Sequence, residues 1–303
     1  MADKLARRVA RVGSSVLFLI GLAVVLALSG GVALADIRQG TDDAETLVGT
    51  NAADRITGGG GNDALKGKAA NDTYHFANHF GEDTLTETAT VGKKRLPGGS
   101  DTLSFADFGS DPLWVSLVPG WAAQGYNKVV AGPDDGVTLG TSPVENVTGG
   151  TSDDNLIGGA AKNTYSGGRG LGEDTIVDYG GWDGNGVRVA QAPSDDVYKG
   201  FASGTGVDRV TDYGGRSDVL DLRPLRSTDV SFARFGSDAS TANGDETLII
   251  TLNDTTQVYV AGHFAPLENA SQESLGQENG RMEKIVFSDR VVTVAAGAQS
   301  LMR

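Results

Sequence analysis

Residues 58–66 read GGGGNDALK, an arrangement of glycines, acid and apolar residue that recurs every nine residues in the neighbouring chain. Reading forward from Gly40 without insertions gives GTDDAETLV, GTNAADRIT, GGGGNDALK and GKAANDTYH. Each unit begins with glycine, carries an acid at position six and has an apolar or aromatic residue at position eight. Four units in phase indicate a nine-residue structural repeat. The acids are Glu45, Asp54, Asp63 and Asp72, and the residues at position eight are Leu47, Ile56, Leu65 and Tyr74.

A second, less regular array follows Val147 and reads GGTSDDNLI, GGAAKNTYS and GGRGLGEDTIV. Its acid positions are Asp154, Asn163 and, after two additional residues, Asp174. Looser copies continue beyond it, since the motif DVY at 196–198 precedes DRV at 208–210 by 12 residues. The repeat pattern therefore extends, with decreasing regularity, to about Leu222.

These units resemble the nonapeptide calcium-binding repeats of RTX or haemolysin-type proteins, whose pattern is G-G-x-G-x-D-x-U-x with U apolar. Residues 58–66 match every fixed position, and the flanking units keep the first glycine, the acid and U. The resemblance implies an all-β fold, a parallel β-roll or β-solenoid built from glycine-rich repeats, with Ca²⁺ as the bound ion. Family members often end in a segment without metal sites, so a β-rich C-terminal cap is expected, which also covers the last strand of a solenoid.

The residue types explain why such a unit needs a metal. Glycines permit a tight half-turn, and three residues around U form a short strand with U pointing inward. Two units complete one coil, so residues 18 apart are stacked, which places Glu45 beside Asp63 and Asp54 beside Asp72. Strands lie about 4.8 Å apart, so these carboxylates repel each other unless a cation lies between them. Ca²⁺ suits this place better than Mg²⁺ or Zn²⁺, because it accepts six to eight oxygen ligands in flexible geometry.

The predicted metal-site residues are the acids at position six and the glycines of the complete unit. They are Glu45, Asp54, Gly58, Gly59, Gly61, Asp63, Asp72, Asp154 and Asp174. By itself a run of four glycines suits a flexible linker, but the phase of the neighbouring units favours the repeat. A phosphate loop is not indicated, because G-x-x-x-x-G-K-[ST] is absent. For four further acids, metal binding and a local role in a turn both remain open: Asp101, Asp178, Asp212 and Asp218.

Composition, repeat pattern and turn residues divide the chain into five predicted segments. Residues 1–35 are a signal peptide, with a basic start, an apolar stretch and the small-residue exit Ala33-Leu34-Ala35. An uncleaved membrane anchor is the alternative for this segment. Residues 36–92 form the first β-roll, 93–144 a β-rich connecting excursion, 145–227 a second, degenerate β-roll and 228–303 the C-terminal β cap. No other apolar run is long enough to span a membrane.

The charge and the missing cysteines restrict the functions to consider. The 303-residue chain has a formal net charge of −14 and no cysteine. Loss of residues 1–35 removes four bases and one acid and lowers the charge to −17. Such a surface repels nucleic acid and attracts cations. A secreted, extracellular protein without disulfides needs another source of stability, and bound calcium supplies one.

No catalytic motif is present, so we expect no enzyme. H-E-x-x-H and G-x-S-x-G are absent, and the chain has only three histidines. His75 and His79 are four residues apart, but in strand-and-turn context they need not share a face. The sequence favours a secreted calcium-binding protein with a structural or adhesive role and with cell-surface or matrix partners. The alternative is a β-solenoid polysaccharide hydrolase or lyase that uses groove carboxylates as acid and base.

Overall fold

The computed structural model divides the chain into two units, Met1–Ala33 and Leu34–Arg303. The first unit, and with it nearly all of the predicted signal peptide, lies outside the described residues. Within the described ranges, no helix has the length and apolar character that crossing a membrane requires. The structure describes residues 34–87, 89–91, 94–96, 99–109, 111–117, 128–131, 134–139, 144–158, 162–168, 172–178, 195–201, 206–212, 217–235, 247–252, 256–261, 263 and 282–294.

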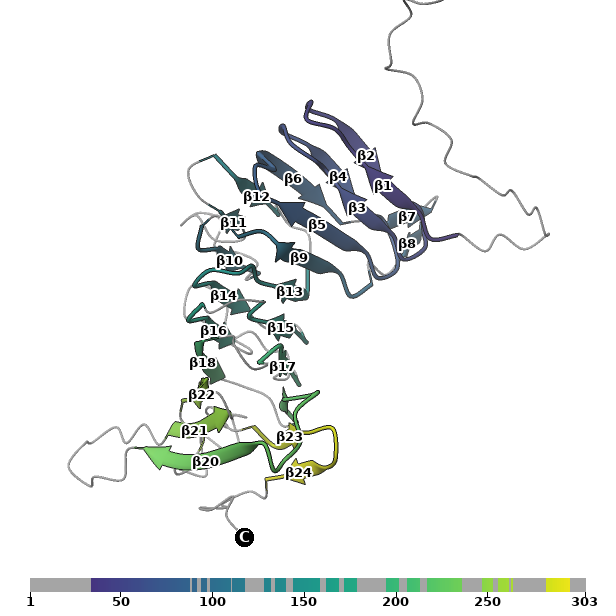
Figure 1. Cartoon of the computed structure of the whole chain (residues 1–303). Coiled ribbons are helices and arrows are strands. Elements are labelled where there is room, and N and C mark those ends of the chain that lie inside the picture. Colours follow the sequence, from purple (N-terminus) through teal and green to yellow (C-terminus); the bar gives the residue numbers. More distant parts are fainter. Residues whose placement is uncertain are drawn as a thin grey trace, which may run out of the picture. The chain divides into compact units, whose positions relative to one another are not determined.

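The described part of Leu34–Arg303 consists of strands in two long sheets and one small sheet (Figure 1). The ten-stranded sheet contains, in spatial order, β1 (Ile37–Gln39), β3 (Arg55–Thr57), β5 (Thr73–Ala77), β9 (Thr102–Asp107), β13 (Asn146–Thr148), β15 (Thr164–Ser166), β17 (Val197–Lys199), β19 (Val219–Asp221), β23 (Lys284–Val286) and β24 (Val291–Thr293). The twelve-stranded sheet contains β2 (Thr46–Val48), β4 (Ala64–Lys66), β6 (Glu82–Thr86), β12 (Gly136–Thr138), β11 (Lys128–Val130), β10 (Trp114–Ser116), β14 (Asn155–Gly158), β16 (Thr175–Asp178), β18 (Val207–Asp212), β22 (Gln257–Val260), β21 (Thr247–Leu252) and β20 (Val230–Phe235). The small sheet pairs β7 (Ala89–Val91) with β8 (Lys94–Leu96).

Successive strands of the repeats alternate between the two long sheets, so two units make one coil. Parallel pairing joins residues 18 apart, as in Ile56 with Tyr74 on one sheet and Leu47 with Leu65 on the other. The predicted parallel β-roll and its 18-residue coil are therefore confirmed. The next coil is longer, because Leu65 pairs with Leu85, 20 residues later.

The core is a stack of the residues at position eight. Strands this short present one inward side chain each, which the neighbouring coils cover above and below. Leu47 is only partly buried, since β2 pairs with β4 alone. The others are fully buried: Ile56, Leu65, Tyr74, Leu156, Tyr165 and Ile176.

The described strands within residues 93–144 lie in the same two sheets. β9 pairs with both β5 and β13, while β12 pairs with β6 and β10 pairs with β14. β10, β11 and β12 form an antiparallel meander between the coils of the first and the second array. At the C-terminal end the pattern changes again, because β20, β21 and β22 pair antiparallel. This β-rich end completes the twelve-stranded sheet, and the five segment boundaries themselves stay a prediction.

Candidate metal centres

A ladder of acids runs along the loops that lead into the ten-stranded sheet. The backbone N–H of Asp36 donates to Oδ1 of Asp54 at 2.6 Å, and the N–H of Asp54 donates to Oδ1 of Asp72 at 2.7 Å. The next bond joins the N–H of Asp72 to Oδ1 of Asp101 at 2.8 Å. Each acid thus binds the backbone of the preceding coil through one carboxylate oxygen. The predicted proximity of Asp54 and Asp72 is confirmed.

A second ladder runs along the loops that lead into the twelve-stranded sheet. Glu45 N–H donates to Oδ1 of Asp63 at 2.8 Å, and Asp63 N–H donates to Oδ1 of Asp83 at 2.8 Å. In the later coils Asp154 N–H donates to Oδ1 of Asp174 at 3.0 Å. All six acids of the predicted metal site therefore belong to one of the two ladders, and Glu45 lies beside Asp63 as expected.

The second oxygen of each ladder acid points across its own loop, and here the acids differ. In three acids it accepts a backbone N–H from position two of the same unit: Glu45 Oε2 from Thr41 at 2.7 Å, Asp54 Oδ2 from Thr50 at 2.5 Å and Asp154 Oδ2 from Gly150 at 2.6 Å. In four others Oδ2 is fully buried and has no hydrogen-bond partner among the described residues. These four are Asp63, Asp72, Asp83 and Asp101.

Glycine is required where the loops approach each other. A Cβ on Gly58 would lie 2.4 Å from Oδ2 of Asp63 in the same unit. Gly59 has φ +101°, and a Cβ there would lie 2.0 Å from the carbonyl oxygen of Thr41 in the preceding coil. Gly61 has φ +87°, a conformation that L-residues rarely adopt. The loop of residues 58–63 thus brings Oδ2 of Asp63 close to the backbone of both coils.

Burial sets the electrostatics of these acids. It raises the pKa of Asp72 to about 6, of Asp83 to about 7 and of Asp101 to about 8, well above the ordinary value of an aspartate. The same cause raises the pKa of Asp154 to about 6 and of Asp174 to about 8. Neighbouring acids raise the pKa further, and hydrogen bonds from the preceding coil lower it. A cation between such groups removes the cost of their charge, so the donor set fits a hard divalent ion.

Two segments, residues 39–74 and 140–176, match the RTX calcium-binding nonapeptide repeat, in four copies. The chain carries RTX-type calcium-binding nonapeptide repeats. The matched segments contain all nine predicted metal-site residues, and they include both the complete unit 58–66 and the second array. A comparison with curated proteins finds no match.

The ladders continue beyond the matched RTX repeats, and these later acids are missing from the predicted site. Asp83 and Asp101 follow the first array, and Asp101 and Asp218, which the sequence left open, both prove to be ladder members. The signal was an acid two residues before a buried apolar residue, as in DTL at 83–85 and DTL at 101–103. The nine-residue phase is lost there, so the pattern did not identify them.

Two histidines considered as a metal pair have separate roles. His75 Nε2 lies 2.8 Å from Oδ2 of Asp107 on the neighbouring strand β9. His79 lies in a turn with φ +63°, and its backbone N–H donates to Asp135 at 3.1 Å. The groups of three metal-ligating side chains found among the described residues include neither histidine.

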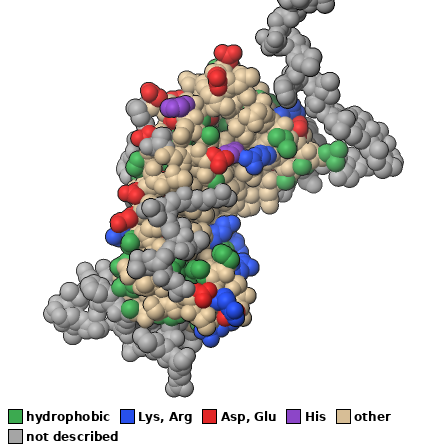
Figure 2. All heavy atoms as spheres, in the orientation of Figure 1, with side chains coloured by type: hydrophobic (Ala, Val, Ile, Leu, Met, Phe, Trp, Pro, Cys, Tyr) green, Lys and Arg blue, Asp and Glu red, His purple; other side chains and the backbone are tan. Residues whose placement is uncertain are grey.

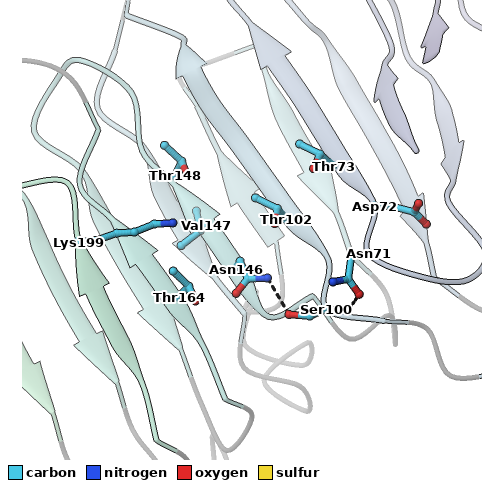
Figure 3. A pocket seen from close by; sticks show the side chains of 10 residues that line it. All are labelled: Asn71, Asp72, Thr73, Ser100, Thr102, Asn146, Val147, Thr148, Thr164 and Lys199. Atoms are coloured by element: carbon cyan, nitrogen blue, oxygen red, sulfur yellow. Dashed lines mark hydrogen bonds between the residues drawn. The ribbon is translucent and has the colours of Figure 1, made fainter. Parts of the chain in front are cut away.

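A shallow polar groove of about 330 Å³ crosses the outer face of the ten-stranded sheet (Figure 3). Asn146 Nδ2 donates to Ser100 Oγ at 2.9 Å, and Ser100 N–H donates to Asn71 Oδ1 at 2.9 Å. The only carboxylate in its lining is Asp72, which is 1% exposed. A glycoside-cleaving site needs two carboxylates that reach the substrate, so the groove lining gives the hydrolase alternative no such pair.

The visible charges are distinct from the ladder acids. On the face shown in Figure 2, acidic side chains lie mainly along the loops of the first coils, and Lys and Arg are more frequent near the C-terminal strands. The ladder acids Asp63, Asp72 and Asp101 are at most 3% exposed. Their charge is therefore inside the roll, where screening by salt is weak.

Proposed function

We propose that this chain is a secreted calcium-binding protein whose β-roll folds around Ca²⁺ held by ladder acids and loop carbonyls, with a structural or adhesive role. The observation that carries the proposal is that Oδ2 of four acids along the two ladders is buried and has no hydrogen-bond partner among the described residues: Asp63, Asp72, Asp83 and Asp101. A buried carboxylate oxygen without a partner is costly, and a bound cation removes that cost.

Within the predicted site, Asp63 and Asp72 are the strongest ligands, because each has one oxygen that accepts no hydrogen bond from the described residues. The loop glycines Gly58, Gly59 and Gly61 allow the close approach that turns backbone carbonyls toward the same space. The remaining acids contribute one oxygen to the backbone ladder and share the other between a loop N–H and the ion. These are Glu45, Asp54 and Asp154, with Asp174 completing the second array.

Calcium dependence of folding follows from the same residues. The loops are rich in glycine, whose backbone loses much entropy on ordering, and each strand buries only one side chain per unit. The ladder acids also place negative charges close together along the two sets of loops, and their mutual repulsion opposes folding. In our proposal the ion supplies the missing stabilisation, so the roll forms outside the cell, where calcium-binding modules typically have dissociation constants of about 0.1 to 1 mM.

The proposals that the protein is secreted and which partners it has are based on the sequence. The basic and apolar start of residues 1–35 supports export, and the net charge of −14 argues against nucleic-acid partners. Cell-surface or matrix components are the partners we propose for a structural or adhesive protein. A non-catalytic role is supported by the acids of the ladders, whose regular spacing is explained by ion binding alone.

A calcium titration monitored by circular dichroism tests the proposal. The full chain in EGTA is expected to lack β signal and to gain it at roughly 0.1 to 1 mM calcium. Magnesium at the same concentration serves as the control and is expected to be much less effective, because it keeps its waters and requires a strict octahedron. A chain that is fully folded in EGTA and binds no calcium would contradict the proposal.

A further inference from the structure

Two groups of three buried carboxylates lie at coils whose sequence departs from the nonapeptide pattern. Within each group, one oxygen from every residue lies within 4.8 Å of those from the other two. All six side chains are at most 1% exposed. Like charges this close inside a protein cannot remain uncompensated. The first group is Asp72, Glu87 and Asp101, and the second is Asp196, Asp212 and Asp218.

The first group combines two ladder acids with one acid from the opposite sheet. Asp72 and Asp101 are consecutive ladder members, and Glu87 follows directly after β6. Strand pairing aligns Lys66 with Thr86, so Glu87 stands at the place of Gly67 one coil later. A Cβ on Gly67 would lie 2.4 Å from Oε1 of Glu87 and 2.2 Å from Oδ2 of Asp72. The acid thus replaces the glycine that opens a unit and reaches the loop interior.

The second group has the same construction. Asp196 N–H donates to Oδ1 of Asp218 at 2.7 Å, so these two are also consecutive ladder members. Asp212 is the last residue of β18 and again stands where a unit would open. The sequences agree as well, since DTLTE at 83–87 and DRVTD at 208–212 share an acid at the first and fifth positions. Two coils far apart in the chain have therefore acquired the same three carboxylates.

An intermediate coil shows what happens when one member is missing. Asp178, at the end of β16, has the same place as Glu87 and Asp212. The preceding ladder position there is Asn163, which leaves one carboxylate fewer. This coil does not produce a group of three among the described residues.

In or beside both groups there are buried polar atoms for which the described residues offer no hydrogen-bond partner. Oδ2 of Asp72 and Oδ2 of Asp101 are buried and accept no hydrogen bond from the described residues. The hydroxyl of Tyr198 is also buried and has no hydrogen-bond partner in the part of the chain that the structure describes, and Asp212 and Asp196 are among the charges that act on it. In the first group the corresponding tyrosine, Tyr74, donates its hydroxyl hydrogen to Oε1 of Glu87. Free oxygens of this kind beside clustered carboxylates indicate a missing positive ligand.

We propose that each group binds one calcium ion inside the roll, at coils where an acid replaces the opening glycine. This inference rests on the proposed function. Glu87 extends the site that Asp72 and Asp101 provide, and Asp212 belongs to a second site beyond the matched repeats; the nonapeptide pattern predicts neither acid. The ligands are oxygens only, which disfavours zinc. The side chains are almost completely buried, which disfavours magnesium, because magnesium gives up its waters reluctantly.

Ion counting on the full chain by native mass spectrometry, at about 1 mM calcium, tests the proposal. Glu87→Gln and Asp212→Asn keep the side-chain shape and remove one charge each. We expect each variant to bind one calcium ion fewer than the parent, and the double variant two fewer. Glu82→Gln is the matched control, since Glu82 lies exposed on the same strand as Asp83, and its ion count should not change.

Terbium luminescence gives a second measurement, which does not depend on counting bound ions. Terbium occupies calcium sites and is sensitised by aromatic rings close to the ion. Tyr74→Phe and Tyr198→Phe should each alter the tyrosine-sensitised signal and its half-saturation, whereas Tyr259→Phe, on the half-buried face of β22, should leave them unchanged. If a charge variant fails to fold in calcium, the two tyrosine variants still show whether an ion binds at each group.

The outcomes separate this inference from the proposed function. A parent chain that binds no calcium would overturn both. A parent chain that binds calcium and loses ions in Asp63→Asn, but keeps its full count in Glu87→Gln and Asp212→Asn, would overturn only the two interior sites. An unchanged terbium signal in both tyrosine variants would argue against them in the same way.

Discussion

The backbone N–H of Asp54 donates a 2.7 Å hydrogen bond to Oδ1 of Asp72, which lies 18 residues further along the chain. This bond uses one carboxylate oxygen to hold two coils together and leaves the other directed into its own loop. A ladder acid is therefore a structural link and a candidate ligand at the same time. Substitutions can separate the two roles, because the second oxygen is occupied in some acids and free in others.

Asp63→Asn is expected to weaken calcium binding more than Asp54→Asn. In Asp63 the free Oδ2 becomes an amide NH₂, which cannot ligate a cation, so the calcium midpoint should rise by about tenfold or more, or about 1.4 kcal/mol. In Asp54 the new NH₂ faces the N–H of Thr50, so the main loss should be stability, by about 1 to 3 kcal/mol even in saturating calcium. Calcium titrations and urea unfolding of both variants measure the two effects. Equal shifts in midpoint would contradict the distinction.

Gly59→Ala is expected to disrupt the complete repeat, whereas Gly60→Ala should be tolerated better. Gly59 has φ +101°, and its Cβ would lie 2.0 Å from the carbonyl oxygen of Thr41. The positive φ alone costs about 1 to 2 kcal/mol, and the backbone contact adds to it. At Gly60 the nearest atom to a Cβ is the carbonyl oxygen of His79 at 3.3 Å. Urea unfolding in saturating calcium compares the two, and an equal loss of stability would count against the tight loop.

Leu65→Ala is expected to destabilise the roll more than Leu47→Ala, although both residues occupy position eight of stacked units. Leu65 is fully buried between β2 and β6, whereas Leu47 has a covering coil on one side only. The cavity left at residue 65 should cost about 2 to 5 kcal/mol, and the loss at residue 47 should be clearly smaller. Thermal or urea unfolding with calcium present checks the order. A larger effect at residue 47 would mean that the first coil is covered by something else.

Much of the fold was predictable because the repeat phase fixes which residues stack. Gly40 to Tyr74 has no insertions, so a period of nine gives the pairing of Ile56 with Tyr74 directly. The phase gives no information once loops change length. Leu65 pairs with Leu85 after two additional residues, and β5 pairs with β9 across a much longer insertion. Loop length costs little free energy, so a solenoid tolerates such changes without leaving a regular trace in the sequence.

The candidate site was predictable only where the nonapeptide is intact. Asp63 and Asp72 follow from the phase, but Asp83 and Asp101 lie where it is lost. Glu87 and Asp212 were harder still, because an acid in place of the opening glycine looks like the loss of a repeat. Only the structure shows that these acids meet the ladder of the neighbouring coil. The physical reason is that stacking joins residues of different coils, which no single repeat contains.

Acidity is expected to act in opposite directions with and without calcium. Without calcium, burial raises the pKa of Asp83 to about 7 and that of Asp101 to about 8 in the folded chain, whereas an aspartate in an unfolded chain has a pKa of about 4. Protonation of these carboxyls favours the fold, so this contribution is complete below about pH 4 and is lost as the pH rises through 7 to 8. In EGTA, where the chain is expected to lack β signal at neutral pH, circular dichroism should therefore show β signal returning as the pH falls from 8 to 5.

With calcium the dependence reverses, because the ion binds only the ionised carboxylates. Calcium must displace protons from Asp83 and Asp101 at pH 6, so its affinity should rise from pH 6 to pH 8, by about tenfold per pH unit for each proton displaced. Calcium titrations at pH 6, 7 and 8, with proton release recorded in weakly buffered solution, measure this directly. A midpoint that stays constant over this range, with no protons released, would show that these buried acids do not hold the ion.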